Sequence, residues 1–516
     1  MQAIFDGGPP PPVPTPFNLA AHVLEAGTAD PDKVALAIVA PTGAERWSYG
    51  RLRAAVLGIA HGLRAQGLGP GERVLMRLGN DVAFPLAYLG AIAADLVPVP
   101  TSAQLTEREV AKIADHLAPS AVLRDPRVAC PDLACPVYDT SDMAAWRDGP
   151  QGGFVMGDPN RLAYIVMTSG TSGSPRAVAH AHRAVWARRM MVEGWYGLRP
   201  SDRLAHAGAF NWTFTLGTGL LDPWAAGATA IIPADGVAPA QLPLLLKRHE
   251  ATLFAAAPGV YRQMLKHAPF DLPKLRHGLS AGEKMPEALR GAWRAATGTE
   301  VYEAYGMSEC STFISAAPDR PAAPGTLGRP QDGRRVAILG PEGPEPLDTP
   351  GEIAVDRTDP GLMLGYVDAP EATAEKMNGA WFLTGDRGQM AADGTITYLG
   401  RMDDLMNAGG LRVSPLEIEE ALLAHPGIDE VGAAEVEVKD GVRVIGAFWT
   451  GPEPLDDAAL HAFASERLAR YKCPRVWVRC DALPKSTNGK LQRRALPALR
   501  DPIHSTGERG APARPV

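Results

Sequence analysis

The chain has 516 residues, which at roughly 150 residues per domain predicts about three folding units. Hydrophobic residues make up 46% and charged residues 21% of it, a composition typical of globular proteins that excludes a disordered chain. The formal net charge is -7, so there is no overall basic field that would hold nucleic acid or anionic lipid.

The cysteine pattern and the N-terminus indicate a reducing compartment. Five cysteines, an odd number without Cys-x-x-Cys spacing, argue against a disulfide framework and a structural zinc site.

Residues 1–16 lack the basic and apolar regions of a signal peptide, and their four consecutive prolines predict a flexible, extended arm. Residues 82–100, the longest apolar stretch, are broken by prolines and predict a buried helix running into a strand. We therefore expect a cytoplasmic protein without a membrane segment.

The sequence pattern changes near residue 401, and this change predicts two main domains. Between residues 17 and 401, helical periodicity alternates with short β-rich runs, beginning with a helix at 51–66, a strand at 72–76 and a helix at 85–94. The rest predicts a small α+β domain with helices at 417–424 and 456–471 and paired strands at 431–438 and 442–449. The predicted division is an arm (1–16), an N-terminal domain (17–401), a C-terminal domain (402–500) and a frayed tail (501–516).

The most informative segment, residues 164–176, is an apolar strand that leads into a loop of glycines and hydroxyl residues, followed by a basic residue and a helical run. Glycine lets the backbone approach an anion, and hydroxyl and N–H groups can donate to phosphate oxygens. The chain contains no Gly-x-x-x-x-Gly-Lys-Ser/Thr, so this is not a Walker loop. Taken alone, such a loop is a plain turn about as often as a phosphate site.

Four further segments carry side chains suited to nucleotide chemistry. Residues 302–309 hold a tyrosine that can stack on a base, a serine that can donate to phosphate and a glutamate that can ligate Mg²⁺. Asp386 ends an apolar run and can accept hydrogen bonds from ribose hydroxyls. Residues 400–404 lie at the domain boundary, and residues 483–493 present Lys490 on a glycine-containing turn. Each alone also fits a strand-end turn or a solvated charge.

Taken in order, Thr-Ser-Gly-Thr-Ser-Gly-x-Pro, Tyr-Gly-Met-Ser-Glu, Thr-Gly-Asp, Gly-Arg-x-Asp-Asp and Pro-Lys-x-x-x-Gly-Lys resemble the adenylate-forming superfamily. The resemblance covers almost the whole chain and is strongest to AMP-forming synthetases of the benzoate-CoA and medium-chain acyl-CoA ligase group. It implies an α/β fold: a large N-terminal domain of stacked αβαβα layers with a small β-barrel-like subdomain, and a small mobile α+β C-terminal domain. It also implies ATP, Mg²⁺ and coenzyme A as cofactor and co-substrates.

The resemblance implies a role for each matching residue. A mobile loop over the β- and γ-phosphates of ATP would be formed by Thr168, Ser169, Gly170, Thr171, Ser172 and Gly173, followed by Arg176. The adenine site would be formed by Ser280, Ala281, Gly282, Glu303, Ala304, Tyr305 and Gly306. Ser308 would contact the α-phosphate and Glu309 would ligate Mg²⁺. The ribose hydroxyls would be bound by Asp386 and Arg401.

The implied reaction has two steps. A carboxylate oxygen attacks the α-phosphate of ATP and pyrophosphate leaves, after which a thiol displaces AMP from the acyl-adenylate. Lys490 would bridge the carboxylate and the α-phosphate in the first step, where negative charge builds up. Asp403 would be the hinge about which the C-terminal domain rotates between the steps, and Gly409 and Gly410 would line the CoA tunnel.

The acid pocket is expected to be lined by Phe210, Asn211, Trp212, Phe214 and Thr215, whose aromatic walls suit an aromatic or a compact, medium-chain carboxylic acid. Benzoate ligases carry Lys-Leu-Phe-Phe-Ala-Tyr-Gly here, a run this chain lacks, so we expect a benzoate-like acid rather than benzoate itself. The phosphate loop continues Pro-Arg-Ala where the family has Pro-Lys-Gly. Arg176 keeps the positive charge, whereas Ala177 lacks the conformational freedom of glycine.

Other functions stay open at this point. Coenzyme A is favoured as the thiol because no carrier segment is appended, and the main alternative is a stand-alone adenylating enzyme that loads a separate carrier protein. A luciferase-like oxygenase and a non-catalytic binding protein are further alternatives, the second opposed by the intact Glu309, Asp386 and Lys490. The expected partners are a small carboxylic acid, ATP and CoA, without nucleic acid or membrane, and a homodimer is compatible with the sequence.

Overall fold

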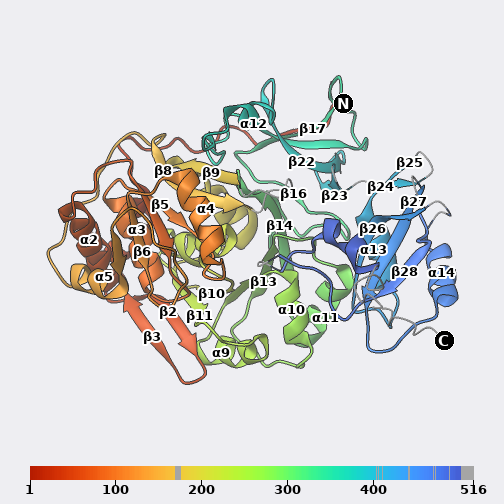
Figure 1. Cartoon of the computed structure of the whole chain (residues 1–516), viewed down its shortest axis with the longest axis horizontal. Coiled ribbons are helices and arrows are strands. Elements are labelled where there is room, and N and C mark those ends of the chain that lie inside the picture. Colours follow the sequence, from red (N-terminus) through yellow and green to blue (C-terminus); the bar gives the residue numbers. More distant parts are fainter. Residues whose placement is uncertain are drawn as a thin grey trace, which may run out of the picture. The chain divides into compact units, whose positions relative to one another are not determined.

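The computed structural model describes residues 1–168, 176–402, 404, 406–408, 411–439, 442–468, 470, 472–486 and 489–500 (Figure 1). The chain forms two compact units. Unit 1 contains Met1–Thr384 and Gly388–Tyr398, whereas unit 2 contains Gly385–Arg387 and the chain from Leu399 onward. The polypeptide therefore passes between the units at 384/385, 387/388 and 398/399. Within the described residues, no helix is both long and apolar enough to cross a membrane.

The largest sheet of unit 1 has nine strands in the order β16-β15-β14-β13-β12-β10-β11-β2-β3. Its six central strands are parallel, and the pairs at both edges are antiparallel. The strands are β2 (Val34–Ala40), β3 (Gly43–Ser48), β10 (Arg203–Ala207), β11 (Thr229–Pro233), β12 (Leu253–Ala256), β13 (His277–Ala281), β14 (Val301–Met307), β15 (Ser311–Ser315) and β16 (Arg329–Pro330). Short apolar runs make these strands, because a parallel sheet is buried on both faces.

A second, four-stranded parallel sheet has the order β5-β4-β6-β7. Its strands are β4 (Arg73–Arg77), β5 (Val97–Pro100), β6 (Ala121–Arg124) and β7 (Val137–Asp139). Successive side chains of β4 alternate between two cores: Val74 and Met76 pack in one with α2 (Tyr49–Ala65) and α3 (Ala83–Ala93), and Leu75 packs in the other with α4 (Glu107–Leu117). The predicted helices at 51–66 and 85–94 and the strand at 72–76 are confirmed.

The layers of unit 1 are stacked as predicted. One face of the nine-stranded sheet is covered by α9 (Leu242–Arg248), α10 (Pro258–Leu265) and α11 (Glu287–Thr297) through the core around Phe254 and Trp293. Helices α2 and α3 share a core with strands of both sheets, and α4 lies beyond the second sheet (Figure 1). The order αβαβα follows, and helix, sheet, helix, sheet and helix each bury an apolar face against the next.

Two smaller sheets complete unit 1. The first contains β8 (Leu162–Thr168), β9 (Arg176–Ala181) and β20 (Gly365–Tyr366), and the second contains β1 (Ile4–Asp6), β17 (Arg335–Gly340), β18 (Gly343–Pro344), β19 (Gly351–Asp356), β21 (Met377–Asn378), β22 (Trp381–Met390) and β23 (Ile396–Arg401). The strand path of the second runs from β1 to β21, so the expected barrel-like subdomain is an open sheet among the described residues. The expected N-terminal arm contributes β1, which pairs with β17.

The helical run expected directly after Arg176 is wrong. Residues 176–181 form β9, which pairs antiparallel with β8 from Thr168↔Arg176 to Leu162↔Ala181. Helix α6 (Arg183–Ala187) begins only after this hairpin. The reason is tertiary: pairing with β8 and β20 and burial of the alanines outweigh the helix propensity of alanine.

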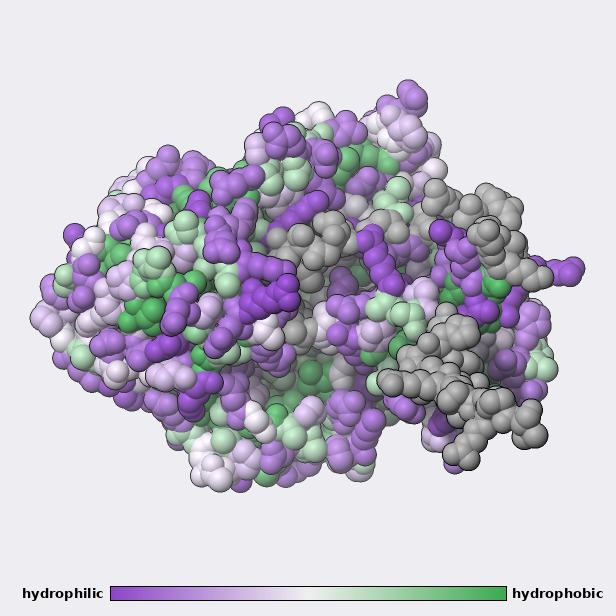
Figure 2. Space-filling model, viewed as in Figure 1, coloured by the Kyte–Doolittle hydropathy of each residue, from purple (hydrophilic) through white to green (hydrophobic). Residues whose placement is uncertain are grey.

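The remaining helices of unit 1 are short and cover the sheets. They are α1 (Leu19–Glu25), α5 (Thr140–Arg147), α7 (Arg189–Met191), α8 (Asp222–Ala225) and α12 (Pro370–Ala374), with π-helical turns η2 (Val192–Tyr196) and η3 (Thr215–Leu221) and 3-10 turns η1 (Ala26–Thr28) and η4 (Pro239–Gln241). On the face drawn in Figure 2, hydrophobic side chains form scattered patches between hydrophilic ones.

Unit 2 is the predicted α+β arrangement. It contains β24 (Met406–Ala408), β25 (Leu411–Val413), α13 (Pro415–Leu423), β26 (Glu430–Lys439), β27 (Val442–Thr450), α14 (Asp457–Ser465), β28 (Val476–Arg479) and the 3-10 helix η5 (Arg493–Arg500). Strands β26 and β27 form the expected antiparallel pair, and β28 adds in parallel. Helix α14 is shorter than the predicted 456–471.

A buried ion pair joins α6 to α8 in unit 1. The Arg188 guanidinium donates to both carboxylate oxygens of Asp222, at 2.7 and 2.6 Å, and the Tyr196 hydroxyl donates to the same carboxylate at 2.6 Å. Arg188 is 8% and Asp222 4% exposed. Arg188 also contacts Ser311, on β15. The pair therefore ties η2 and α8 to strand β15 of the large sheet.

Two buried histidines predict acid sensitivity. Burial lowers the pKa of His180 to about 4 and that of His206 to about 3, from 6.5, so each binds a proton more readily in the unfolded chain. The free energy of unfolding should therefore fall as the pH drops below 6.5, by up to about 1.4 kcal/mol per pH unit for each histidine. Urea titrations at pH 7 and pH 5 measure this slope. His206→Asn should reduce it, whereas His267→Gln at an exposed position should not; equal slopes in all three proteins would contradict the prediction.

Candidate active site

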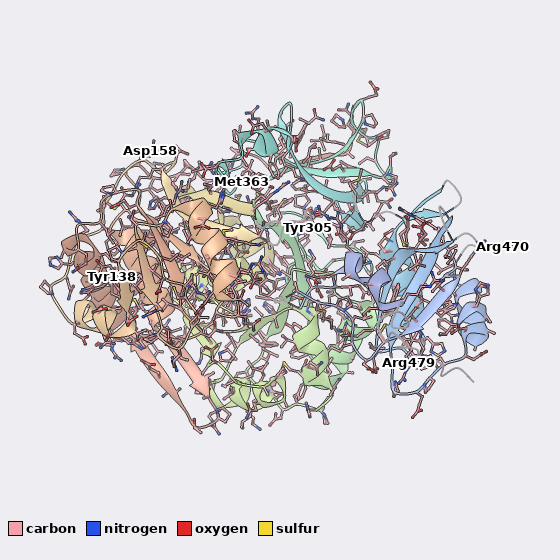
Figure 3. All side chains as sticks on the ribbon, viewed as in Figure 1. Tyr138, Asp158, Tyr305, Met363, Arg470 and Arg479 are labelled. Atoms are coloured by element: carbon pink, nitrogen blue, oxygen red, sulfur yellow. The ribbon has the colours of Figure 1, made fainter. Side chains whose placement is uncertain are left out.

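Tyr305 and Gly306 lie at an irregular point of β14, where the register with β15 shifts. Tyr305, which is labelled in Figure 3, is half-buried. Its ring lies 5.4 Å from that of Phe313 and 5.7 Å from that of Tyr398, measured between ring centroids. A Cβ on Gly306 would lie 2.0 Å from the carbonyl oxygen of Ser311, so no larger residue fits. The close approach of the two backbones therefore fixes where the tyrosine ring stands at the end of the strand.

Glu309 follows β14 and is held by two residues of one distant segment, Met363 and Tyr366. The Tyr366 hydroxyl donates to its Oε1 at 2.6 Å, and its backbone carbonyl accepts from the amide of Met363 at 2.7 Å. The guanidinium of Arg176 lies over the Tyr366 ring, 5.0 Å from the centroid. Burial and the Glu309 carboxylate raise the pKa of Tyr366, so the phenol keeps its proton and remains a donor.

Ser308 is positioned through its backbone. The Nε2 of His180, on β9, lies 2.7 Å from the Ser308 carbonyl oxygen, and the His180 ring stacks on Tyr164 at 4.9 Å. The hairpin β8–β9 thus supports the segment that carries Ser308 and Glu309. At the end of the same hairpin, the Thr168 hydroxyl donates to the backbone carbonyl of Arg176 at 3.4 Å.

An aromatic wall stands at the ends of β10 and β13. Trp212 meets Phe214 edge to face at 5.1 Å, and a Cβ on Gly282 would lie 2.8 Å from the Trp212 ring. Phe214 and Ala281 share one core. Gly282 has a φ of +93°, a conformation that suits glycine. The structure therefore brings Trp212, Phe214, Ala281 and Gly282 together.

Phe210 does not belong to this wall. It is 1% exposed and packs on Phe84 at 5.2 Å, in the core that includes α2 and α3. Asn80 holds its loop, because the Asn80 amide donates to the Gly208 carbonyl at 2.8 Å and accepts from the Phe210 N–H at 2.8 Å. Asn211 is half-buried, and Thr215 is fully buried at the start of η3.

Ser280 and Glu303 face away from the wall. They are paired in register on β13 and β14, and alternation puts them on the opposite face from Ala281 and Ala304. Glu303 is buried, accepts from Arg290 of α11 at 2.9 Å and from the Met285 amide at 3.1 Å, and burial raises its pKa to about 7. Ser280 and Glu303 therefore lie on the face of the sheet opposite to the aromatic wall.

In unit 2, Asp386 and Arg401 lie side by side on β22 and β23. The Arg401 Nη1 is 3.4 Å from the Asp386 carboxylate, which is 6% exposed. Lys490 is exposed on a turn in which its backbone N–H donates to the Ser486 hydroxyl at 3.2 Å and its carbonyl accepts from the Ser486 N–H at 2.8 Å. Gly489, with a φ of +80°, allows this turn.

Several predicted residues lie outside the described residues: Ser169, Gly170, Thr171, Ser172 and Gly173 of the phosphate loop, the hinge residue Asp403, and Gly409 and Gly410 of the CoA tunnel. Sequence reasoning missed Tyr366 and His180. Both act on the Ser308–Glu309 segment from far away in the chain, so no local spacing could have found them.

The Glu309 carboxylate suits a magnesium ion, which needs few protein ligands, better than a metal that is bound entirely by protein side chains. No group of three or more His, Cys, Asp or Glu side chains that could hold a metal occurs in the parts of the chain the structure describes. Mg²⁺ is commonly bound by one or two carboxylates together with substrate phosphates. A single carboxylate at the end of β14, oriented by a phenol, fits that requirement.

Comparison with known proteins places both units in one class. Residues 24–367 match the family described as AMP-binding enzyme, and residues 417–490 match its C-terminal domain. The chain is 32% identical to a 3-hydroxybenzoate–CoA ligase of Aromatoleum sp. (strain CIB), over 89% of this chain and 92% of that protein. It is 28% identical to the human mitochondrial acyl-coenzyme A synthetase ACSM3, over 94% and 90%. A benzoate CoA ligase from Burkholderia xenovorans LB400 has a TM-score of 0.84 and 26% identity, over 93% of this chain and 99% of that one.

Proposed function

Since the chain belongs to the AMP-binding enzyme family, we propose that it is an AMP-forming acid–CoA ligase that acts on an aromatic carboxylic acid. The observation that carries the proposal is the pairing of two features at the ends of β13 and β14. One is the Glu309 carboxylate held by Tyr366, and the other is the flat wall of Trp212 and Phe214 against Gly282. The residues proposed for a metal–phosphate site and for a planar acid would thus be carried by the neighbouring strands β13 and β14.

The proposed reaction joins the acid to CoA in two displacements. A carboxylate oxygen of the acid forms a bond to the α-phosphorus of ATP, and the bond to pyrophosphate breaks. The sulfur of CoA then bonds to the acyl carbon, the bond to AMP breaks, and the thiol proton is released. Tyr305 would stack on adenine, and Asp386 and Arg401 would hold the ribose. Bound Mg²⁺ would supply positive charge to the phosphate oxygens, with Glu309 as its protein ligand.

The test is a substrate panel with purified protein, ATP, Mg²⁺ and CoA. Benzoates and C3–C10 fatty acids are supplied one at a time, and AMP, pyrophosphate and acyl-CoA are measured by mass spectrometry. We expect AMP and an aryl-CoA thioester to rise together with an aromatic acid. Acyl-adenylate without thioester would instead indicate an enzyme that loads a carrier protein, and turnover of fatty acids alone would contradict the aromatic assignment.

The substitution Tyr366→Phe tests whether the hydrogen bond from the Tyr366 hydroxyl orients the Glu309 carboxylate. Without the phenol the carboxylate loses a hydrogen bond of 2.6 Å and is oriented less well, so the Mg²⁺ concentration for half-maximal rate should rise about tenfold. The rate at saturating Mg²⁺ should change less. Tyr138→Phe is the matched control, because Tyr138 packs against Trp146 and is far along the chain from this site. An unchanged Mg²⁺ requirement in Tyr366→Phe would show that Glu309 needs no such support.

A further inference from the structure

His206 is a fully buried side chain with no polar contact in the protein. It lies on β10, is 0% exposed, and neither Nδ1 nor Nε2 has a hydrogen-bond partner. Burial lowers its pKa to about 3, so the ring is neutral and offers one N–H donor and one acceptor lone pair. Buried polar groups are nearly always hydrogen-bonded, so a group with both functions unmet points to a ligand.

Three other buried histidines of the described chain, His180, His182 and His277, are different. The Nε2 of His277 pairs with the Tyr196 carbonyl at 2.8 Å, that of His180 pairs with the Ser308 carbonyl, and the Nδ1 of His182 accepts from the Leu19 amide at 3.0 Å. Each of these rings has a protein partner for at least one nitrogen. Among the buried side-chain atoms without a partner in the described chain, only His206 contributes both ring nitrogens.

The surroundings of His206 connect it to the aromatic wall. Its ring meets Phe214 edge to face at 4.4 Å between centroids, and Phe214 in turn meets Trp212, which rests on Gly282. His206 therefore contacts the wall at Phe214, whereas Gly282 contacts it at Trp212. The Thr215 hydroxyl is also buried and without a partner, and both it and the His206 ring lie next to Gly208.

Two glycines leave room for this pair of polar groups. A Cβ on Gly208 would lie 2.2 Å from the Thr215 Oγ1 and 3.3 Å from the His206 Nδ1. Both polar atoms are therefore close to Gly208. A Cβ on Gly219 would lie 2.9 Å from the His206 Cβ. Any other residue at either position would push against the histidine or the threonine.

We propose that His206, with Thr215, recognises a ring hydroxyl group on the aromatic acid. The inference rests on the proposed function and narrows it to hydroxylated aromatic carboxylic acids. A hydroxyl is both donor and acceptor, which matches a neutral imidazole beside a threonine. A ring that lies along Phe214 with its carboxylate toward the Gly282 end would direct such a substituent at His206. The relative from Aromatoleum carries hydroxybenzoate in its name.

The experiment compares kcat/KM for benzoate, 3-methylbenzoate, 3-hydroxybenzoate and 4-hydroxybenzoate by thioester formation. The methyl group fills similar space without hydrogen bonds. We expect the wild type to favour one of the hydroxy acids over 3-methylbenzoate by at least about tenfold. His206→Phe should bring this ratio close to one, and His206→Asn, which keeps a donor and an acceptor, should retain part of it. The control His277→Gln should leave the ratio unchanged.

Three results would overturn the proposed role of His206 or separate it from the proposed function. A wild type without a hydroxyl preference, or a ratio unaffected by His206→Phe, would mean that a buried water satisfies the histidine and would overturn the inference. Equal losses with all four acids in His206→Phe would show a purely structural role. If the wild type forms no thioester with any acid, the proposed function fails, and calorimetric binding of the same acids to wild type and His206→Phe then decides the inference separately.

Discussion

Replacing Lys490 by alanine is expected to lower the rate of acyl-adenylate formation by about 10²–10³-fold. Thioester formation from preformed acyl-adenylate should stay within about threefold of wild type. The first displacement builds negative charge on the α-phosphate and needs a fixed positive charge, whereas the second removes AMP and does not. Lys490 has an exposed side chain, and its backbone makes two hydrogen bonds with Ser486. These bonds fix the backbone from which the charged side chain extends.

The two half-reactions are measured separately, by pyrophosphate release with acid and ATP and by thioester formation with synthetic acyl-adenylate and CoA. Lys485→Ala is the matched control, since Lys485 lies on the same turn but is paired with Glu430 at 2.7 Å. Its removal should alter both rates little. Equal losses in the two half-reactions of Lys490→Ala would exclude a role confined to adenylation.

Arg188→Met is expected to lower the free energy of unfolding by about 3–5 kcal/mol. The substitution leaves the Asp222 carboxylate buried with the Tyr196 hydroxyl as its remaining strong donor, and an uncompensated buried charge is costly. Urea unfolding monitored by tryptophan fluorescence measures the loss, because Trp195 lies in the core next to Tyr196.

Two further variants interpret this result. Arg188→Met combined with Asp222→Leu removes both charges, so the double variant should be more stable than Arg188→Met alone. Arg147→Met breaks the exposed pair with Asp148 and should cost less than about 1 kcal/mol. If Arg188→Met were no more harmful than Arg147→Met, the buried pair would not be the link between α6 and α8 that its contacts suggest.

The sequence predicted the elements whose apolar spacing is strong and local. Helices α2, α3 and α13 and strands β4, β26 and β27 occur within a few residues of their predicted bounds, because each has a strong apolar pattern that lies within the element itself. The small second unit was predicted from the change in sequence pattern near residue 401, and the layer order through the resemblance of five motifs. The strand β9 was missed because its alanines are equally compatible with a helix, and only pairing with β8 decides between them.

The site was predicted less completely than the fold. The motifs predicted Tyr305 and Glu309 as site residues, which stays a prediction, and spacing alone could not show that Phe210 packs on Phe84 or that Glu303 faces α11. Those facts depend on strand register and on which face of the sheet each residue occupies. Tyr366, His180 and His206 became visible only when chain segments far apart in sequence were placed in contact.

The passage of the chain between its two units limits how the protein can be recombined with relatives. A graft of the C-terminal unit joined only at 398/399 would combine the donor's arginine at position 401 with the acceptor's own Asp386. The two charges facing each other would then have different evolutionary origins. A clean exchange has to carry Gly385–Arg387 as well, three residues inside strand β22, so swapping modules here requires an internal replacement in addition to a single splice.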